Sequence, residues 1–169
     1  MNVFYLDTDP KLAAQYHCDK HCSKMLIEYA QLMSTAHCET NSPHADLCYK
    51  ATHVNHPSNV WTRASQDHYT WLWDCWHSLS NEFYKRRGKY HASWVKLGHI
   101  LCYNPPGLPC AGFTQPPLCM PECYHQEDAV EAYRDYYRHD KSRFAQWNWG
   151  TEAPFWWSIP CEHPGLMVQ

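Results

Sequence analysis

The chain has 169 residues, of which 44% are hydrophobic and 18% charged. A chain of this length makes one ordinary domain and buries roughly 70% of its unfolded surface, so it folds without cross-links, and its composition excludes a disordered protein. The 14 basic and 17 acidic residues give a formal net charge of −3, which excludes a general attraction to nucleic acid and leaves only local basic patches for such contacts.

The apolar runs are short, and Val3–Leu6 is among the longest. A membrane helix needs roughly 20 apolar residues, so we expect no membrane partner. The first residues, MNVFYLDTDP, lack the basic region and apolar stretch of a secretory signal, so we expect a cytoplasmic protein. Thiols stay reduced there, and the 10 cysteines are not by themselves a disulfide framework.

Helices dominate the predicted elements. Val3–Leu6 predicts a short extended arm. Asp9 and Pro10 then match an N-cap followed by proline at the first helical position, and no glycine or proline interrupts a helix from about Pro10 to Ala36. The polar stretch from Cys38 to Asn55 predicts a loop.

A second long helix is predicted from Pro57 to about Arg87, where Gly88 ends it. Apolar side chains fall on one side of this helix and predict its buried face. A third, shorter helix is expected from about Tyr90 to Tyr103.

Six prolines and two glycines in residues 104–126 predict a long proline-rich loop. A last helix is predicted from about Asp128 to Trp147, and an irregular tail from Gly150 onward. The expected fold is mainly all-α, a compact bundle of about four helices with a short extended N-terminal arm and this loop. We expect a single domain over residues 1–169.

One face of the first predicted helix combines two imidazoles, an amine and a carboxylate. His17, His21, Lys24 and Glu28 follow at helical spacing within a stripe roughly 80° wide. Two histidines four residues apart can share a metal ion with a nearby carboxylate, so His17, His21 and Glu28 are candidate metal ligands. The alternative is the solvated face of an amphipathic helix.

Asp19 points away from this stripe, toward the side we expect to be partly buried. A buried carboxylate needs a partner, and His37 and Arg63 are the candidates. Together with the stripe, Asp19 completes the candidate catalytic residues of the first helix.

Two histidines lie immediately before the second predicted helix. His53 and His56 stand on a turn, and Pro57 keeps His56 out of the helical conformation. Arg63 follows two turns later, off the apolar face of the helix. These side chains are suited to meet an anion or a metal, although one histidine would equally serve to cap or orient the turn.

Two basic clusters are candidate phosphate-binding surfaces. Several cations beside a glycine can surround a nucleic-acid backbone, and cations next to an aromatic ring suit phosphate contacts combined with base stacking. The alternatives are a favourable cationic helix end and ion pairing with Asp135 and Asp140. The candidate residues are Lys85, Arg86, Arg87 and Lys89 in the first cluster, and Arg134, Arg138 and Lys141 in the second.

The C-terminal half contains cysteine and histidine residues of the type that bind zinc, but their spacing matches no closed pair of CxxC motifs. These residues are Cys110, Cys119, Cys123, His125, Cys161 and His163.

Nine segments in order resemble a widespread group of small bacteriophage proteins. They read NVFYLDTDP, HCDKHCSKM, EYAQLMSTAH, YKATHVNHP, VWTRAS, FYKRRGKYH, GFTQPP, MPECY and VEAYRDYYRHDKSRFAQW. The group is in turn similar to the small helical pyrimidine-dimer DNA glycosylases, in the order of its elements and in the His-Pro before the second long helix. The resemblance implies a phage protein of the host-cell cytoplasm.

The second resemblance implies a mechanism. The N-terminal α-amine attacks the sugar C1′ atom, a helix carboxylate assists, and a Schiff base leads to strand cleavage. Because Asn2 is a large second residue, we expect Met1 to be retained and to supply the amine. Asp19-Lys20-His21 replaces the arginine–glutamate pair of the glycosylases, and a desolvated Lys20 or Lys24 is the alternative nucleophile.

The leading hypothesis is therefore an enzyme, and specifically a base-excision glycosylase/lyase acting on DNA or a modified nucleotide without a cofactor. The first alternative is a hydrolase or oxygenase that uses a divalent metal held by histidines and a carboxylate. The second is a non-enzymatic protein that binds a nucleotide or inhibits a host factor. The candidate catalytic residues are His17, Asp19, His21, Lys24, Glu28, His53, His56 and Arg63.

Overall fold

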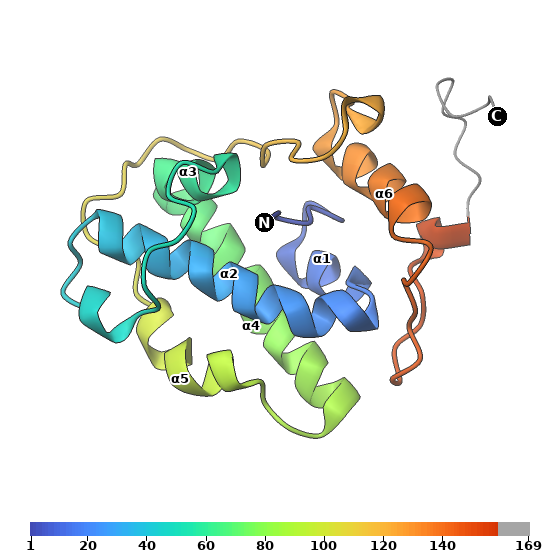
Figure 1. Cartoon of the computed structure of the whole chain (residues 1–169), viewed down its shortest axis with the longest axis horizontal. Helices are drawn as coiled ribbons and strands as arrows, with labels where there is room; N and C mark the ends of the chain where they lie inside the picture. Colours follow the sequence, from blue (N-terminus) through green and yellow to red (C-terminus); the bar gives the residue numbers. More distant parts are fainter. Residues whose placement is uncertain (159–169) are drawn as a thin grey trace.

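A computed structural model describes residues 1–158 of the chain. This part contains helices and no strand, which confirms a mainly α-helical fold (Figure 1). None of its helices is long and apolar enough to cross a membrane. Of the zinc candidates, Cys161 and His163 lie outside the described residues. The α-helices are α1 (Pro10–Tyr16), α2 (Asp19–Glu39), α3 (Pro57–Ala64), α4 (Gln66–Arg87), α5 (Ala92–Leu101) and α6 (Ala129–Asp140), and the short 3-10 helices are η1 (Ala45–Leu47), η2 (Glu122–Tyr124) and η3 (Phe155–Ser158).

The described part has six α-helices, where the sequence predicts about four, because two predicted helices are each divided. The first divides between α1 and α2, where His17 has extended backbone with ψ 128°. Its carbonyl oxygen accepts a hydrogen bond from Arg86, and the N–H of Asp19 donates to the carbonyl of Gln146. These partners are distant in sequence, so no local signal marks the break.

The second predicted helix divides at Ser65, which has extended backbone and caps α4 by accepting a hydrogen bond from the N–H of Asp67. The N–H of Gln66 donates to the carbonyl of Pro109, so a distant segment fills the break. The end of α4 agrees with the prediction, since Gly88 adopts the left-handed conformation and donates to Tyr84. α6 ends at Asp140, seven residues before the predicted Trp147.

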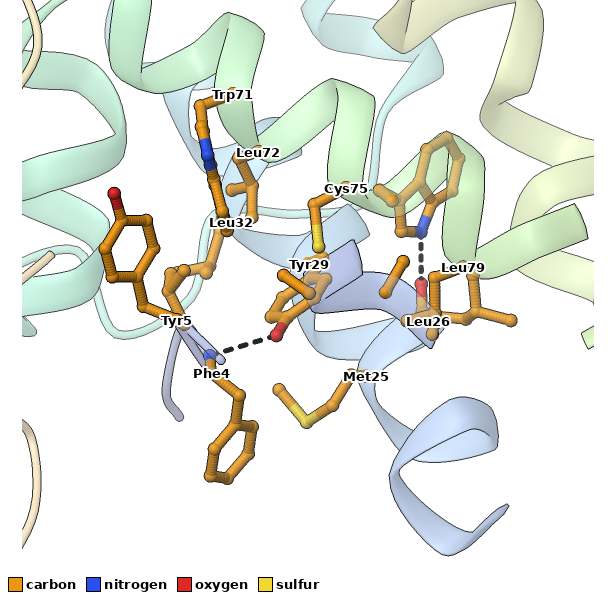
Figure 2. Packing of buried hydrophobic residues seen from close by; sticks show 14 of the residues in the cluster. Phe4, Tyr5, Met25, Leu26, Tyr29, Leu32, Trp71, Leu72, Cys75 and Leu79 are labelled. Carbon is orange, nitrogen blue, oxygen red and sulfur yellow. Dashed lines mark hydrogen bonds between the residues drawn. The ribbon is translucent and has the colours of Figure 1, made fainter. Parts of the chain in front are cut away.

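The N-terminal arm runs into the core rather than over the surface (Figure 1). Val3, Phe4, Tyr5 and Leu6 are all buried. The N–H of Phe4 donates to the hydroxyl of Tyr29 in α2 at 3.0 Å, as Figure 2 shows. The arm therefore behaves as a core element, packed against α2 and α4.

α4 crosses behind α2 and supplies the opposite wall of the core (Figures 1 and 2). Its Trp76 is fully buried and donates to the carbonyl of Leu26 in α2 at 2.8 Å. Trp61, Cys75 and Leu79 are buried as the apolar face predicts. Most of the tryptophan and tyrosine side chains are either buried in this core or partly buried and packed against it.

The segment between α5 and η2, residues 102–121, contains no helix or strand. It runs from α5 past α3 toward α6 in Figure 1. The carbonyl of Thr114 accepts a hydrogen bond from the indole of Trp61, and its N–H donates to His68. These bonds attach the segment to the start of α4.

A buried ion-pair cluster connects both ends of the helical break to α4. The guanidinium of Arg86 lies 3.2 Å from the carboxylate of Asp19 and 3.3 Å from that of Glu82. It also donates to the carbonyls of Gln15 and His17, at 3.0 and 2.8 Å. The side chain of Arg86 has no exposed surface, so every one of these contacts is desolvated.

Replacing Arg86 with methionine is expected to lower the free energy of unfolding by about 3–5 kcal/mol, because Asp19 and Glu82 would then be buried without their partner. Chemical denaturation followed by circular dichroism measures the change. Lys89→Ala is the matched control, since Lys89 is exposed just after the end of α4, and is expected to change stability by less than about 0.5 kcal/mol. Equal stability of the Arg86→Met protein and the control would refute this role.

Candidate functional site

His17 is fully buried at the break between α1 and α2. Its Nδ1 atom lies 2.7 Å from the carbonyl of Ala13, and its Nε2 atom 2.8 Å from the hydroxyl of Tyr29. Since Tyr29 also binds the N–H of Phe4, the imidazole helps to seat the N-terminal arm. Both ring nitrogens are used inside the fold.

His21 is 4% exposed and faces the core from the first turn of α2. Its ring stacks on Phe4 with centroids 4.5 Å apart, and its Nδ1 atom lies 2.6 Å from the hydroxyl of Tyr137 in α6. Burial lowers the pKa of His21 to about 2 and that of His17 to about 4. Both histidines are therefore neutral core groups at physiological pH.

The expected catalytic stripe is thus divided. His17 and His21 enter the core, whereas Lys24 is exposed and Glu28 is half-buried, their side chains forming an ion pair at 3.2 Å. The break removes His17 from the regular spacing of α2, whereas His21 is covered by Phe4 of the arm and Tyr137 of α6.

The prediction that Asp19 pairs with His37 or Arg63 is wrong. Asp19 is 5% exposed, and its carboxylate pairs with Arg86 and accepts a hydrogen bond from the N–H of Asn148 at 2.7 Å. His37 instead contacts Ser42 and Tyr69.

A second group of residues surrounds the N-terminus. Met1 is half-buried, and its Sδ atom lies 3.6 Å from the side-chain nitrogen of Asn59 in α3. Burial lowers the pKa of His56, and the charges of the Met1 α-amine and of His53 lower it further, whereas Glu28 opposes them. His56 therefore lies within electrostatic reach of both the α-amine and Glu28.

The turn before α3 holds His53 and His56 in place. His53 has a φ of 48°, in the left-handed region that non-glycine residues adopt rarely. Arg63 donates to the carbonyl of Val54 at 2.8 Å, and Asn59 donates to the carbonyls of Thr52 and His53, both at 2.9 Å. Strained backbone of this kind occurs at functional sites.

His56 caps α3 by accepting a hydrogen bond from the N–H of Ser58 at its Nδ1 atom. In the neutral imidazole the hydrogen therefore lies on Nε2. A cavity of about 500 Å³ opens beside His56, between Pro57 and the residues Pro117–Pro121, with Tyr136 on one side. His56 thus lines this cavity and also lies near the α-amine of Met1.

The basic candidates differ in accessibility. Lys85, Arg87 and Lys89 are exposed around the end of α4, and the Arg87 guanidinium lies 3.6 Å from the ring centroid of Trp149. Arg86, in the same run, is enclosed by the ion-pair cluster. Its donors are used inside the fold, so no phosphate can reach them.

The second basic cluster is largely paired within the protein. Arg134 binds the carbonyl of Leu6 and the carboxylate of Asp7, and Arg138 binds Asp135 and the carbonyl of Trp156. Lys141 contacts Asp140 and the hydroxyl of Tyr136. These contacts agree with ion pairing within the protein, which was the alternative to phosphate binding for this cluster.

Within residues 1–158, no group of three or more His, Cys, Asp and Glu residues could hold a metal ion. Of the metal candidates, His17 and His21 have core partners, and Glu28 pairs with Lys24. Cys110, Cys119 and Cys123 are free thiols in this part of the chain. His125 contacts the carbonyl of Met120.

The structure also brings forward two residues that sequence reasoning did not select, Asn2 and Asn59. The sequence places Asn59 three residues after His56, on the first turn of a helix that begins at Pro57, and this position alone could have marked Asn59 as a neighbour of the histidine turn. The contact of Asn59 with Met1 links residues 58 positions apart and has no local signature.

Comparison of the chain with family models, with curated proteins and with solved structures finds no match.

The buried histidines make stability dependent on pH. Burial also lowers the pKa of His37 to about 4, so His17, His21 and His37 bind fewer protons when folded than when unfolded. Above about pH 6.5 these histidines are neutral in both states and do not lower the free energy of unfolding. Below that pH the unfolded state binds more protons, so the free energy of unfolding falls toward pH 4 by up to about 1.4 kcal/mol per pH unit for each histidine.

Urea unfolding between pH 7 and pH 4.5 measures this slope. His21→Gln is expected to reduce it, whereas His99→Gln, which replaces an exposed histidine, leaves it unchanged. Stability that does not fall over this interval would refute the assignment of neutral core histidines.

Proposed function

We propose that the protein is a phage-type DNA glycosylase/lyase in which the α-amine of Met1 is the nucleophile. The observation that carries this proposal is the imidazole of His56, which lies within electrostatic reach of the α-amine of the half-buried Met1 and of the carboxylate of Glu28. It agrees with the mechanism that the resemblance to pyrimidine-dimer DNA glycosylases implies.

The N-terminal arm supports a fixed position for the amine. Val3 is fully buried, and Phe4 is bound to Tyr29, so only Asn2 separates Met1 from a rigid core element. A nucleophile held in one place needs less ordering to reach the transition state. The core histidines His17 and His21 contribute through Tyr29, Phe4 and Tyr137 rather than by contact with a substrate.

The proposed reaction begins with attack of the neutral amine on the sugar C1′ atom. The bond from C1′ to the base breaks, and the base leaves with the electron pair and the first amine proton. The second amine proton then passes to the ring oxygen O4′ as the C1′–O4′ bond breaks, which opens the sugar ring and leaves a Schiff base between C1′ and the amine nitrogen. Abstraction of a C2′ proton then expels the 3′ phosphate, and water releases the amine.

Glu28 is suited to stabilise the positive charge that develops at C1′ during this reaction. Burial lowers the pKa of His56 and favours its neutral form, so the imidazole adds no positive charge beside the α-amine, which must lose a proton before it attacks. The Nδ1 lone pair of His56 is already bound to the N–H of Ser58. In this proposal Lys24 is the partner of Glu28 and not the nucleophile.

The exposed cations at the end of α4 are proposed to bind the DNA backbone. The formal net charge of −3 makes such a local patch necessary for binding to a polyanion. Lys85, Arg87 and Lys89 are the accessible members, with the indole of Trp149 beside Arg87.

Borohydride trapping on DNA with an abasic site is the direct test. A protein whose first residue is Met1 is expected to form a covalent complex. An additional residue before Met1 is expected to reduce trapping about 100-fold by displacing the amine. Glu28→Gln is expected to reduce trapping by about the same factor.

Lys24→Ala serves as the comparison variant and is expected to be trapped like the original protein. Failure to trap Lys24→Ala, with normal trapping of the extended chain, would assign the nucleophile to the lysine. Absence of any covalent complex with the original protein would reject the glycosylase/lyase proposal.

Salt dependence tests the DNA-binding surface. Replacing Lys85, Arg87 and Lys89 with alanine is expected to weaken binding to duplex DNA and to reduce the slope of log K against log salt by about 0.9 for each phosphate that the variant no longer neutralises. Lys11→Ala and Lys50→Ala, which remove exposed lysines of α1 and of the loop before α3, are the control substitutions. Equal slopes for the triple variant and the original protein would exclude this surface.

A further inference from the structure

Asn59 is held in a single orientation at the start of α3. Its side chain is 1% exposed, and its nitrogen donates to the carbonyls of Thr52 and His53, both at 2.9 Å. Two carbonyl acceptors on one side identify that side as the nitrogen, so Oδ1 points the other way. The amide hydrogens are thus committed to the turn that contains the left-handed His53.

The Oδ1 atom of Asn59 is buried and has no hydrogen-bond partner among the described residues. The same holds for the Oδ1 atom of Asn2, the neighbour of Met1 in the chain. A buried acceptor without a donor costs about 1–3 kcal/mol, so native proteins rarely keep one without a use. Two such acceptors on residues that adjoin Met1 indicate a site that receives N–H hydrogens.

We infer that Asn59 is a positioning residue for the α-amine of Met1, with its Oδ1 atom accepting a hydrogen from that amine. The part of this inference that concerns catalysis rests on the proposed function. Asn59 contacts the Met1 side chain through its nitrogen, 3.6 Å from Sδ, so the amide already lies against the residue that carries the amine.

This arrangement directs the reactive lone pair. An amine that donates a hydrogen to Asn59 has one N–H direction fixed, so its lone pair no longer samples all orientations. The rigid support comes from the turn, since the same amide binds the carbonyls of Thr52 and His53, and Thr35 of α2 binds the N–H of Thr52 at 3.3 Å. Asn59 thus connects the backbone of the turn to the amine.

Labelling of the Met1 α-amine with an acylating reagent, followed by mass spectrometry across a pH series, tests the contact without requiring DNA. Asn59→Asp places a negative charge at the acceptor and is expected to move the midpoint of labelling to higher pH by about one unit or more. Asn59→Leu removes the acceptor without adding charge and is expected to move the midpoint to lower pH. If Asn59→Asp fails to fold, the Asn59→Leu shift decides.

Thr35→Val is the matched control. It removes the hydroxyl that binds Thr52, and so loosens the same turn, but it changes neither the amide of Asn59 nor the local charge. Its labelling midpoint is expected to equal that of the original protein. A midpoint unchanged in a folded Asn59 variant, or shifted equally by Thr35→Val, would overturn the inference.

The borohydride experiment separates this inference from the proposed function. Asn59→Leu is expected to reduce the rate of trapping about tenfold or more, with a smaller effect in Thr35→Val. A shifted labelling midpoint without any trapping of the original protein would reject the proposed function and support the contact. Normal trapping with an unshifted midpoint would reject the contact and support the proposed function.

Discussion

The guanidinium of Arg86 holds together the parts of this fold that have no local reason to meet. It binds carbonyls at the end of α1, the carboxylate that begins α2 and Glu82 one turn earlier in α4. Asp19 in turn accepts the N–H of Asn148, and Glu82 accepts the hydroxyl of Thr151. One buried cation therefore sets the break between α1 and α2 and anchors the segment that follows α6.

That break determines what the histidines do. Because His17 leaves the helical path, its ring turns toward Ala13 and Tyr29, and the next histidine, His21, stacks on Phe4. Both rings then support the N-terminal arm. The two histidines therefore support the residues that lead to Met1 instead of forming a catalytic face, and the half-buried Glu28 of the same stripe pairs with Lys24.

The sequence predicts the helical class and several helix ends well, because these depend on neighbouring residues. Asp9 caps α1, Gly88 ends α4, and Asp128 caps α6, all through contacts a few residues apart. The breaks at His17 and Ser65 depend on Arg86, Gln146 and Pro109, which lie far along the chain, and no periodicity reveals them. The same holds for the candidate site. The turn with His53 and His56 depends on neighbouring residues and was predicted, whereas the contact of Asn59 with Met1 joins distant residues and was not.

The arm has a consequence for how the molecule is assembled. Contacts of α6 reach back to the N-terminal arm, since Arg134 binds the carbonyl of Leu6 and the carboxylate of Asp7, which lie 128 and 127 positions earlier. Contacts of such long sequence separation form late, after the entropy of closing a long loop has been overcome. The bond from Phe4 to Tyr29 in α2 closes a loop of only 25 positions, so we expect it to form before the bonds of Arg134 to Leu6 and Asp7.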